Sequence, residues 1–301
     1  MTPTRQGSIR LFRFAGIDLY LHWSWFLVAA YEATSRTGGY SSALWNVLEY
    51  LTLFLIVTLH EFGHALACRQ VGGHSDQIVL WPLGGVAYVS PPQRPGATLW
   101  SIAAGPMVNV ALVPILTTAL LVFGSLGGGE RLPDAYAFLH AILYMNWFLL
   151  IFNLLPVYPL DGGQIVRSLL WFVVGRSRSL MVASIIGFLG VAVLLLLAVL
   201  VHSTWVVILS VFIVLNCWRG LQQARLLARA DRIPRHAGFA CPDCQAAPPV
   251  GAVWICGRCQ NRFDTFVTGA ICPQCLEQYS ETKCFDCGSV HPMSQWIVPL
   301  A

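Results

Sequence analysis

Long uninterrupted apolar segments are the feature that most constrains this chain. The segments from Ile185 to Val201 and from Val206 to Leu215 carry no charged residue. About 20 apolar residues are needed to cross a bilayer, so segments of this kind are typical of transmembrane helices rather than of a soluble core. Only 11% of the residues are charged, where soluble domains carry roughly 25%. The sequence therefore predicts an integral, multi-pass membrane protein.

Six helical spans are predicted, near residues 20–35, 46–69, 100–124, 135–157, 180–201 and 204–222, and the apolar stretch 164–174 belongs to the same membrane-embedded unit. Positive residues concentrate on the cytoplasmic side of membrane proteins. With a cytoplasmic N-terminus, Arg36 and Arg131 are the only arginines of this part that fall outside, and ten others fall inside: Arg5, Arg10, Arg13, Arg69, Arg94, Arg176, Arg178, Arg219, Arg225 and Arg229. Both termini are expected to be cytoplasmic, in a prokaryotic cell membrane.

A β-hairpin is predicted between the second and third spans. The segment QIVLWPLGGVAYV has apolar, β-branched arms around a Pro-Leu-Gly-Gly turn that includes Gly84 and Gly85. It is too apolar for an ordinary surface loop. Irregular backbone is tolerated at membrane depth only beside protein or a water-filled cavity, so the hairpin is expected to be membrane-associated.

The second span ends in a sequence typical of zinc hydrolases. Residues 60–64 read HEFGH, and positions i and i+4 of a helix share one face, so His60 and His64 can bind one metal with Glu61 beside them as the general base. Each ionisable group in a span costs roughly 2.5–3.5 kcal/mol. Three such groups within five residues require a compensating partner, and a divalent metal is the simplest one. A packed or solvated helix face is the alternative interpretation.

A catalytic zinc needs a third protein ligand and an open fourth position. Asp161 is the best candidate, because it is an isolated carboxylate in the apolar segment IFNLLPVYPLDGGQIV. Prolines before it break the helix, and Gly162 and Gly163 allow the backbone to approach another segment. The alternative is that Asp161 only caps the helix that follows.

Together, HEFGH in the second span and NLLPVYPLDGG after the fourth resemble the paired signature of the site-2 protease family. WPLGGVAYV and AAGPMVNV also resemble that family in sequence and order, over roughly residues 8–222. The resemblance implies a six-helix intramembrane metalloprotease, with zinc held by His60, His64 and Asp161 and with Glu61 as the catalytic acid/base. It also implies regulated intramembrane proteolysis of membrane-anchored proteins.

The substrate of such an enzyme is a transmembrane helix, which must unwind before it can be cut. We hypothesise that the edge of the 78–88 hairpin, with Gly84, Gly85 and Val86, pairs with the unwound substrate by strand addition. Proline in place of Val86 or Tyr88 is then expected to abolish cleavage while zinc stays bound. The resemblance also places Asn153 at the substrate or beside the Asp161 segment, whereas helix packing is an equally good explanation. Asn109, in the third span, is interpreted as helix packing.

Eight of the ten cysteines form four CxxC pairs in the C-terminal tail. Two such pairs complete a tetrahedral four-cysteine zinc site. Pairing the first with the second and the third with the fourth predicts two successive zinc ribbons: Cys241, Cys244, Cys256 and Cys259 in one, and Cys272, Cys275, Cys284 and Cys287 in the other. Disulfides are the rival interpretation, disfavoured on a reducing, cytoplasmic side. We expect a protease domain at residues 1–230 and a double zinc-ribbon domain at 231–301.

The tail is not expected to bind nucleic acid. From Cys241 onward it has three basic residues against five acidic ones, whereas phosphate binding needs clustered Lys and Arg. A protein partner is the more natural ligand of the ribbons.

Two other functions fit parts of the sequence. A non-catalytic membrane adaptor would use the ribbons to recruit partners, but it has no need for the general base Glu61. A metal transporter usually shows polar residues along several spans or paired inverted halves, and the sequence has neither. The predicted cofactors are thus one catalytic Zn²⁺ and two structural Zn²⁺.

Overall fold

The structure is a computed structural model that describes residues 7–26, 40–81, 84–202, 204–230 and 232–298. The chain divides into two compact units, Met1–Ala224 and Arg225–Ala301. The first contains the long apolar helices and a four-stranded sheet, and the second contains the cysteine pairs.

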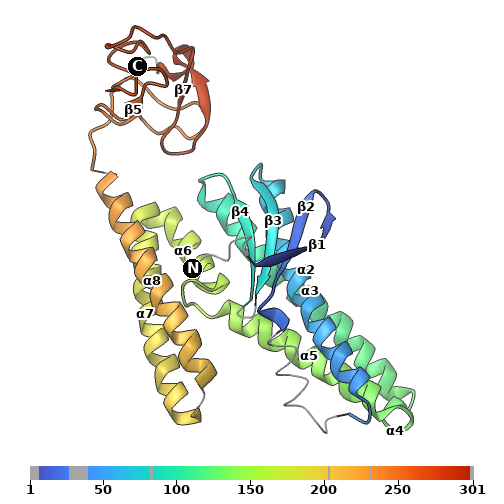
Figure 1. Cartoon of the computed structure of the whole chain (residues 1–301). Helices are drawn as coiled ribbons and strands as arrows, with labels where there is room; N and C mark the ends of the chain where they lie inside the picture. Colours follow the sequence, from blue (N-terminus) through green and yellow to red (C-terminus); the bar gives the residue numbers. More distant parts are fainter. Residues whose placement is uncertain (1–6, 27–39, 82–83, 203, 231, 299–301) are drawn as a thin grey trace. The chain divides into compact units, whose positions relative to one another are not determined.

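The sheet of the first unit has the order β1-β2-β3-β4. Its strands are β1 (Ser8–Phe14), β2 (Ile17–His22), β3 (His74–Trp81) and β4 (Gly84–Ser90). β1–β2 and β3–β4 are antiparallel, whereas β2 and β3 are parallel. This parallel pair is connected through helix α2 (Ala43–Gln70), which packs on the sheet (Figure 1). Ile17, Leu19, Ile78 and Leu80 are fully buried against Val57, Phe62 and Ala65 of α2.

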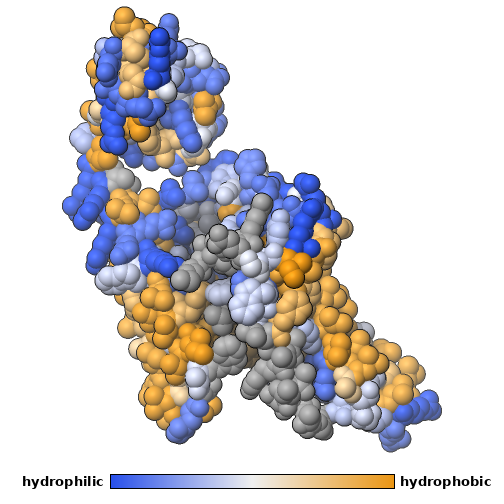
Figure 2. All heavy atoms as spheres, viewed as in Figure 1, coloured by the Kyte–Doolittle hydropathy of each residue, from blue (hydrophilic) through white to orange (hydrophobic). Residues whose placement is uncertain are grey.

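The remaining helices of this unit are α3 (Pro95–Ser125), the short α4 (Gly128–Arg131), α5 (Pro133–Leu154), α6 (Asp161–Val174), α7 (Arg176–Val201) and α8 (Thr204–Ala230). Five of the described helices are long and apolar enough to cross a membrane: α2, α3, α5, α7 and most of α8. Many large apolar side chains of these helices are exposed, and on the face shown in Figure 2 they gather along the helices. The protein is therefore an integral membrane protein.

The structure corrects the first predicted span, near residues 20–35. Its first residues, 20–22, belong to β2 rather than to a helix, because Tyr20 and Leu21 are paired with β1 on one side and with β3 on the other. Residues 27–35 lie outside the described residues. An apolar alternation such as IDLYLH fits a strand with one buried face as well as the start of a span, which explains the misassignment.

The predicted hairpin is confirmed as β3–β4, with Ile78 opposite Ala87 and Leu80 opposite Gly85. The predicted turn residues Pro82 and Leu83 lie outside the described residues. Gly84 and Gly85 belong to β4, which is an edge strand of the sheet.

The second unit consists of two small hairpins, β5 (Trp254–Ile255) with β6 (Arg262–Phe263), and β7 (Glu281–Lys283) with β8 (Val290–Pro292), followed by the 3₁₀ helix η1 (Met293–Trp296). Trp296 is buried with Phe266, Cys241 and Cys284. The two ends of the unit meet, because Ala240 N–H donates to the Trp296 carbonyl at 2.8 Å and Phe239 bridges Ile297.

Candidate functional site

The three ligands predicted in the membrane unit come together. His60 and His64 lie on one face of α2, and Asp161 is the first residue of α6. The distance from His60 Nε2 to His64 Nε2 is 3.1 Å, and Asp161 Oδ2 lies 3.0 Å from the first and 3.3 Å from the second. Ligand atoms about 2.0 Å from a tetrahedral zinc are separated by about 3.3 Å. The three side chains therefore fit a tetrahedral zinc with an open fourth position.

Space for the ion is left by a glycine of α3. A Cβ added to Gly105 would lie 2.3 Å from His64 Nε2 and 2.8 Å from His60 Nε2, close to where a metal bound by both imidazoles must be. Any larger residue at this position would fill the site.

The chain turns sharply before Asp161, as its prolines and glycines predict. A Cβ on Gly162 would lie 2.3 Å from the Leu154 carbonyl oxygen, and one on Gly163 would lie 2.4 Å from Tyr158 N. These close contacts let the start of α6 pack against the end of α5 and against the turn that joins the two helices. The N-cap of α6 is Leu160, so the Asp161 carboxylate is directed at the two imidazoles rather than capping the helix.

Glu61 is buried beside this cluster, with 6% of its surface exposed. Its Oε2 accepts a hydrogen bond from the Ala87 N–H of β4 at 2.8 Å. A Cβ on Gly85 would lie 2.3 Å from Glu61 Cγ, so the glycine allows the edge strand to lie against the carboxylate. The outward edge of β4 therefore faces the predicted general base.

The structure distinguishes between the four residues that were predicted to contact the substrate. Because N–H groups alternate along a strand and Ala87 N–H points to Glu61, the N–H of Val86 is on the β3 side. Proline at Val86 would therefore break the β3–β4 ladder itself. Gly85 shares the outward edge with Ala87. Asn153 is half-buried near the end of α5, and Gly84 begins β4.

Sequence reasoning missed the outer contacts of the two imidazoles. His60 Nδ1 lies 2.6 Å from Asn109 Oδ1, and His64 Nδ1 lies 2.9 Å from the Ser101 carbonyl oxygen. Both partners belong to α3. The sequence suggests only helix packing for Asn109. Its position one helical turn after Gly105, on the helix that covers the ligands, is the signal that could have indicated a contact with His60.

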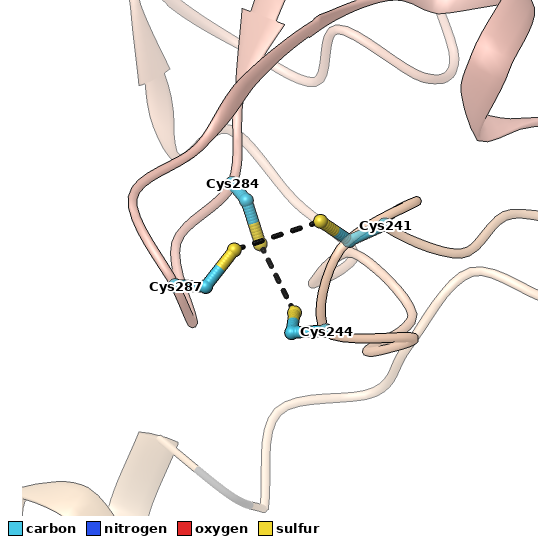
Figure 3. Close-up of side chains that lie close together, drawn as sticks. All are labelled: Cys241, Cys244, Cys284 and Cys287. Atoms are coloured by element: carbon cyan, nitrogen blue, oxygen red, sulfur yellow. Dashed lines mark hydrogen bonds between the residues drawn. The ribbon is translucent and has the colours of Figure 1, made fainter. Parts of the chain in front are cut away.

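The cysteines form two four-thiolate clusters, but the predicted pairing is wrong. The first CxxC pair joins the fourth, as Cys241, Cys244, Cys284 and Cys287 (Figure 3), and the second joins the third, as Cys256, Cys259, Cys272 and Cys275. One ribbon is therefore nested within the other in sequence. We call the first group the outer cluster and the second the inner cluster.

The reason for the error is that all four CxxC pairs have the same local structure. In each, the residue after the second cysteine donates its N–H to the carbonyl of the first cysteine at 2.9–3.0 Å. Zinc chemistry cannot distinguish four equal pairs. Two contacts bring the first CxxC pair to the fourth. One is the hydrogen bond between Ala240 and Trp296 at the two ends of the unit, and the other is the Arg235–Asp286 ion pair at 2.6 Å.

Both clusters fit zinc. The Sγ–Sγ distances across the outer cluster are 3.6 and 3.8 Å, and those across the inner cluster are 3.5 and 3.6 Å. Four thiolates about 2.3 Å from a tetrahedral zinc are separated by about 3.8 Å. In the inner cluster the Tyr279 hydroxyl donates to Cys256 Sγ at 3.1 Å, and it is the largest of the influences that lower the pKa of that thiol to about 6.

Comparisons with known proteins agree with this geometry. The family model for peptidase family M50 matches residues 49–134 and 129–197. A zinc metalloprotease of Methanocaldococcus jannaschii is 32% identical over 68% of this chain and 58% of its own. A Synechocystis protein provisionally named a zinc metalloprotease is 27% identical over 73% of this chain and 61% of its own. The chain thus spans about three-fifths of the length of these curated relatives.

A solved structure gives the same result. The site-2 protease from Methanocaldococcus jannaschii superposes with a TM-score of 0.51 and 27% sequence identity, covering 71% of this chain and 95% of that one. The matched family region contains His60, Glu61, His64 and Asp161. From its motifs, its fold and these matches, the chain belongs to peptidase family M50, the site-2 protease family.

Proposed function

We propose that this protein is an intramembrane zinc metalloendopeptidase, which hydrolyses peptide bonds within or near the transmembrane segments of membrane-anchored proteins in regulated intramembrane proteolysis. The observation that carries the proposal is the convergence of Asp161 with His60 and His64 beside the buried Glu61, on a helix, α2, that is apolar enough to span a membrane. Three ligands with a neighbouring carboxylate are the arrangement of a catalytic zinc site, whereas structural sites use four.

Each side chain has one task in this proposal. His60, His64 and Asp161 would hold the zinc, which when bound supplies Lewis acidity that acidifies a water molecule and polarises a carbonyl group. Glu61 takes a proton from the attacking water and delivers it to the leaving amine nitrogen as the C–N bond breaks. Its burial keeps this proton transfer away from bulk solvent.

The position of β4 at the edge of the sheet supports strand addition as the way in which the substrate is held. Unwinding a transmembrane helix exposes N–H and C=O groups that need partners, and the outward backbone groups of Gly85 and Ala87 lie next to Glu61. A photoreactive residue at Tyr88 is expected to cross-link to a bound substrate. An active protein that gives no cross-link would contradict strand addition.

Location and partners follow from the same proposal. The arginine distribution supports cytoplasmic termini, and the archaeal and cyanobacterial sources of the relatives support a prokaryotic cell membrane. The ribbons would then lie in the cytoplasm and bind a protein partner rather than nucleic acid. External protease added to intact cells should leave the ribbon unit uncut. Digestion of the ribbon unit would show that the C-terminus is outside the cell and would contradict the proposed topology.

The test of the proposed function is Glu61→Gln in the full chain, reconstituted with a single-span substrate. Zinc content should be unchanged, because Glu61 is not among the ligands. Cleavage should fall by roughly 10²–10⁴-fold, the usual contribution of a general acid/base. Glu49→Gln is the matched control, since Glu49 is also buried on α2 but bonds to Tyr40. Cleavage by Glu61→Gln at the wild-type rate would exclude the proposed mechanism.

A further inference from the structure

We infer that Asn109, held by Asn146, is a positioning residue that keeps His60 in the tautomer able to bind metal. The inference rests on the proposed function, because it concerns the same metal site. It assigns a role to two asparagines, one on α3 and one on α5, neither of which is a ligand.

The first step is that the direction of every hydrogen bond in this group is determined. Asn146 Nδ2 lies 3.0 Å from the main-chain oxygen of Asn109, and a carbonyl oxygen can only accept. Asn146 must therefore place its NH₂ group there, which leaves its Oδ1 facing the Asn109 side chain at 2.8 Å. Asn109 must in turn present its NH₂ group to that oxygen. The Oδ1 of Asn109 is then the atom that faces His60 Nδ1 at 2.6 Å.

The second step is the state of His60. Because the facing atom is an amide oxygen, His60 Nδ1 must carry the proton and donate it. In a neutral imidazole with a proton on Nδ1, the lone pair is on Nε2. This is the nitrogen that lies 3.1 Å from His64 Nε2 and 3.0 Å from Asp161 Oδ2. Asn109 therefore directs the lone pair of His60 at the metal position.

The third step is that this orientation has no low-energy alternative. Asn109 and Asn146 are both fully buried, so water cannot replace a lost partner. A rotated Asn109 amide would place NH₂ against the Nδ1–H of His60 and oxygen against oxygen at Asn146. Buried polar groups left in this way are costly, so α3 and α5 together keep one orientation.

His64 reaches the same state by a simpler contact. Its Nδ1 faces the main-chain oxygen of Ser101 at 2.9 Å, and this acceptor cannot rotate. His60 has only a side-chain acceptor, whose two ends differ in polarity. Asn146 is therefore needed to fix which end of the Asn109 amide faces His60. His64 needs no such partner, because its acceptor is the fixed carbonyl of Ser101.

The inference is tested with zinc as the probe, in the purified full chain, by equilibration against a graded series of chelator concentrations. Asn109→Leu is nearly isosteric but removes the acceptor, so the zinc at His60, His64 and Asp161 should bind about 10–100-fold more weakly. Asn109→Asp keeps an oxygen for His60 Nδ1–H, as in carboxylate–histidine–zinc contacts, but sets its second oxygen against Asn146 Oδ1, so it should bind this zinc more tightly than Asn109→Leu and less tightly than the wild type. The thiolate-bound zinc of the ribbons serves as an internal reference in every sample.

A second readout separates positioning from a general packing role. In the zinc-loaded full chain labelled with ¹⁵N-histidine, His60 should carry its proton on Nδ1, identified by difference against His60→Ala. Asn216→Leu is the matched control, because Asn216 is half-buried on α8 and donates to the Phe212 carbonyl; it should change neither readout. This measurement on the wild type also decides the matter if Asn109→Leu does not fold.

Two results would overturn the inference: Asn109→Leu binding the third zinc as tightly as the wild type, or a wild-type His60 protonated on Nε2. Failure of the proposed function looks different. A wild type that binds three zinc ions with the expected tautomer, but cuts no substrate, would refute the peptidase and leave the role of Asn109 standing.

Discussion

The membrane site and the two cysteine clusters suit the same ion but surround it in opposite ways. At the membrane site the outer groups accept hydrogen bonds, because each neutral imidazole has a proton to donate: His60 to Asn109 and His64 to the Ser101 carbonyl. At the inner cluster the outer groups donate, since the Tyr279 hydroxyl points at a thiolate. The polarity of the surroundings therefore follows the charge of the ligand rather than the identity of the metal.

The two kinds of site also differ in what they leave free. The membrane site has three ligands, and His60 and Asp161 are 101 residues apart in the chain, so it exists only when α3, which packs against both α2 and α6, brings the start of α6 to α2. Gly105 keeps the remaining space open. Each cysteine cluster has four ligands and is closed. This contrast is that between a site built for chemistry and one built for stability.

The largest expected effect comes from closing the open site. Gly105→Ala places a Cβ 2.3 Å from His64 Nε2, so the variant should lose the third zinc and all cleavage while keeping the ribbon zinc. Zinc content and cleavage are measured on the same preparation. Gly96→Ala is the control on the same helix, because its Cβ would meet nothing nearer than Phe172 at 3.7 Å. Retention of the third zinc by Gly105→Ala would mean that the ion does not lie between the imidazoles.

The next effect concerns the nested pairing of the cysteines. Cys241→Ser with Cys284→Ser damages only the outer cluster, so this double variant should lose one zinc per chain. Cys241→Ser with Cys256→Ser damages both clusters and should lose two. Successive ribbons would give the reverse order, so total zinc per chain distinguishes the two pairings without any activity assay.

The metal ligands could be predicted from the sequence in the membrane unit but their pairing could not be predicted in the tail, for a physical reason. The membrane unit offers one pair of histidines in HEFGH and one isolated carboxylate in the apolar segment IFNLLPVYPLDGGQIV, so the ligand set has a single solution. The tail offers four equal CxxC pairs. Loop-closure entropy changes slowly with length, so the spacing did not favour one pairing, and the deciding contacts at Ala240 and Trp296 are tertiary.

The same reasoning explains the two other differences between sequence and structure. Residues 20–22 alternate in a way that fits a strand, and only their pairing with β1 and β3 shows that they form one. Asn109 was predicted to pack because a lone Asn in a span often does so. Its contact with His60 depends on how α3 crosses α2, which periodicity does not reveal.

The smallest expected effect concerns the inner cluster of the ribbon unit. Tyr279→Phe removes the hydroxyl that does most to lower the pKa of Cys256, so this pKa should rise toward its ordinary value. A proton then competes better with zinc, and the inner cluster should release its ion at a higher pH as the solution is acidified, with affinity at neutral pH reduced by up to about tenfold.

Ser289→Ala is the reciprocal variant, because the Ser289 hydroxyl lies 3.4 Å from Cys241 Sγ and 2.9 Å from Cys287 Sγ. Zinc release is followed as the pH is lowered. Tyr279→Phe should shift only the release of zinc from the inner cluster, and Ser289→Ala only the release from the outer cluster. A shift of both release steps in one variant would show that the clusters are not independent.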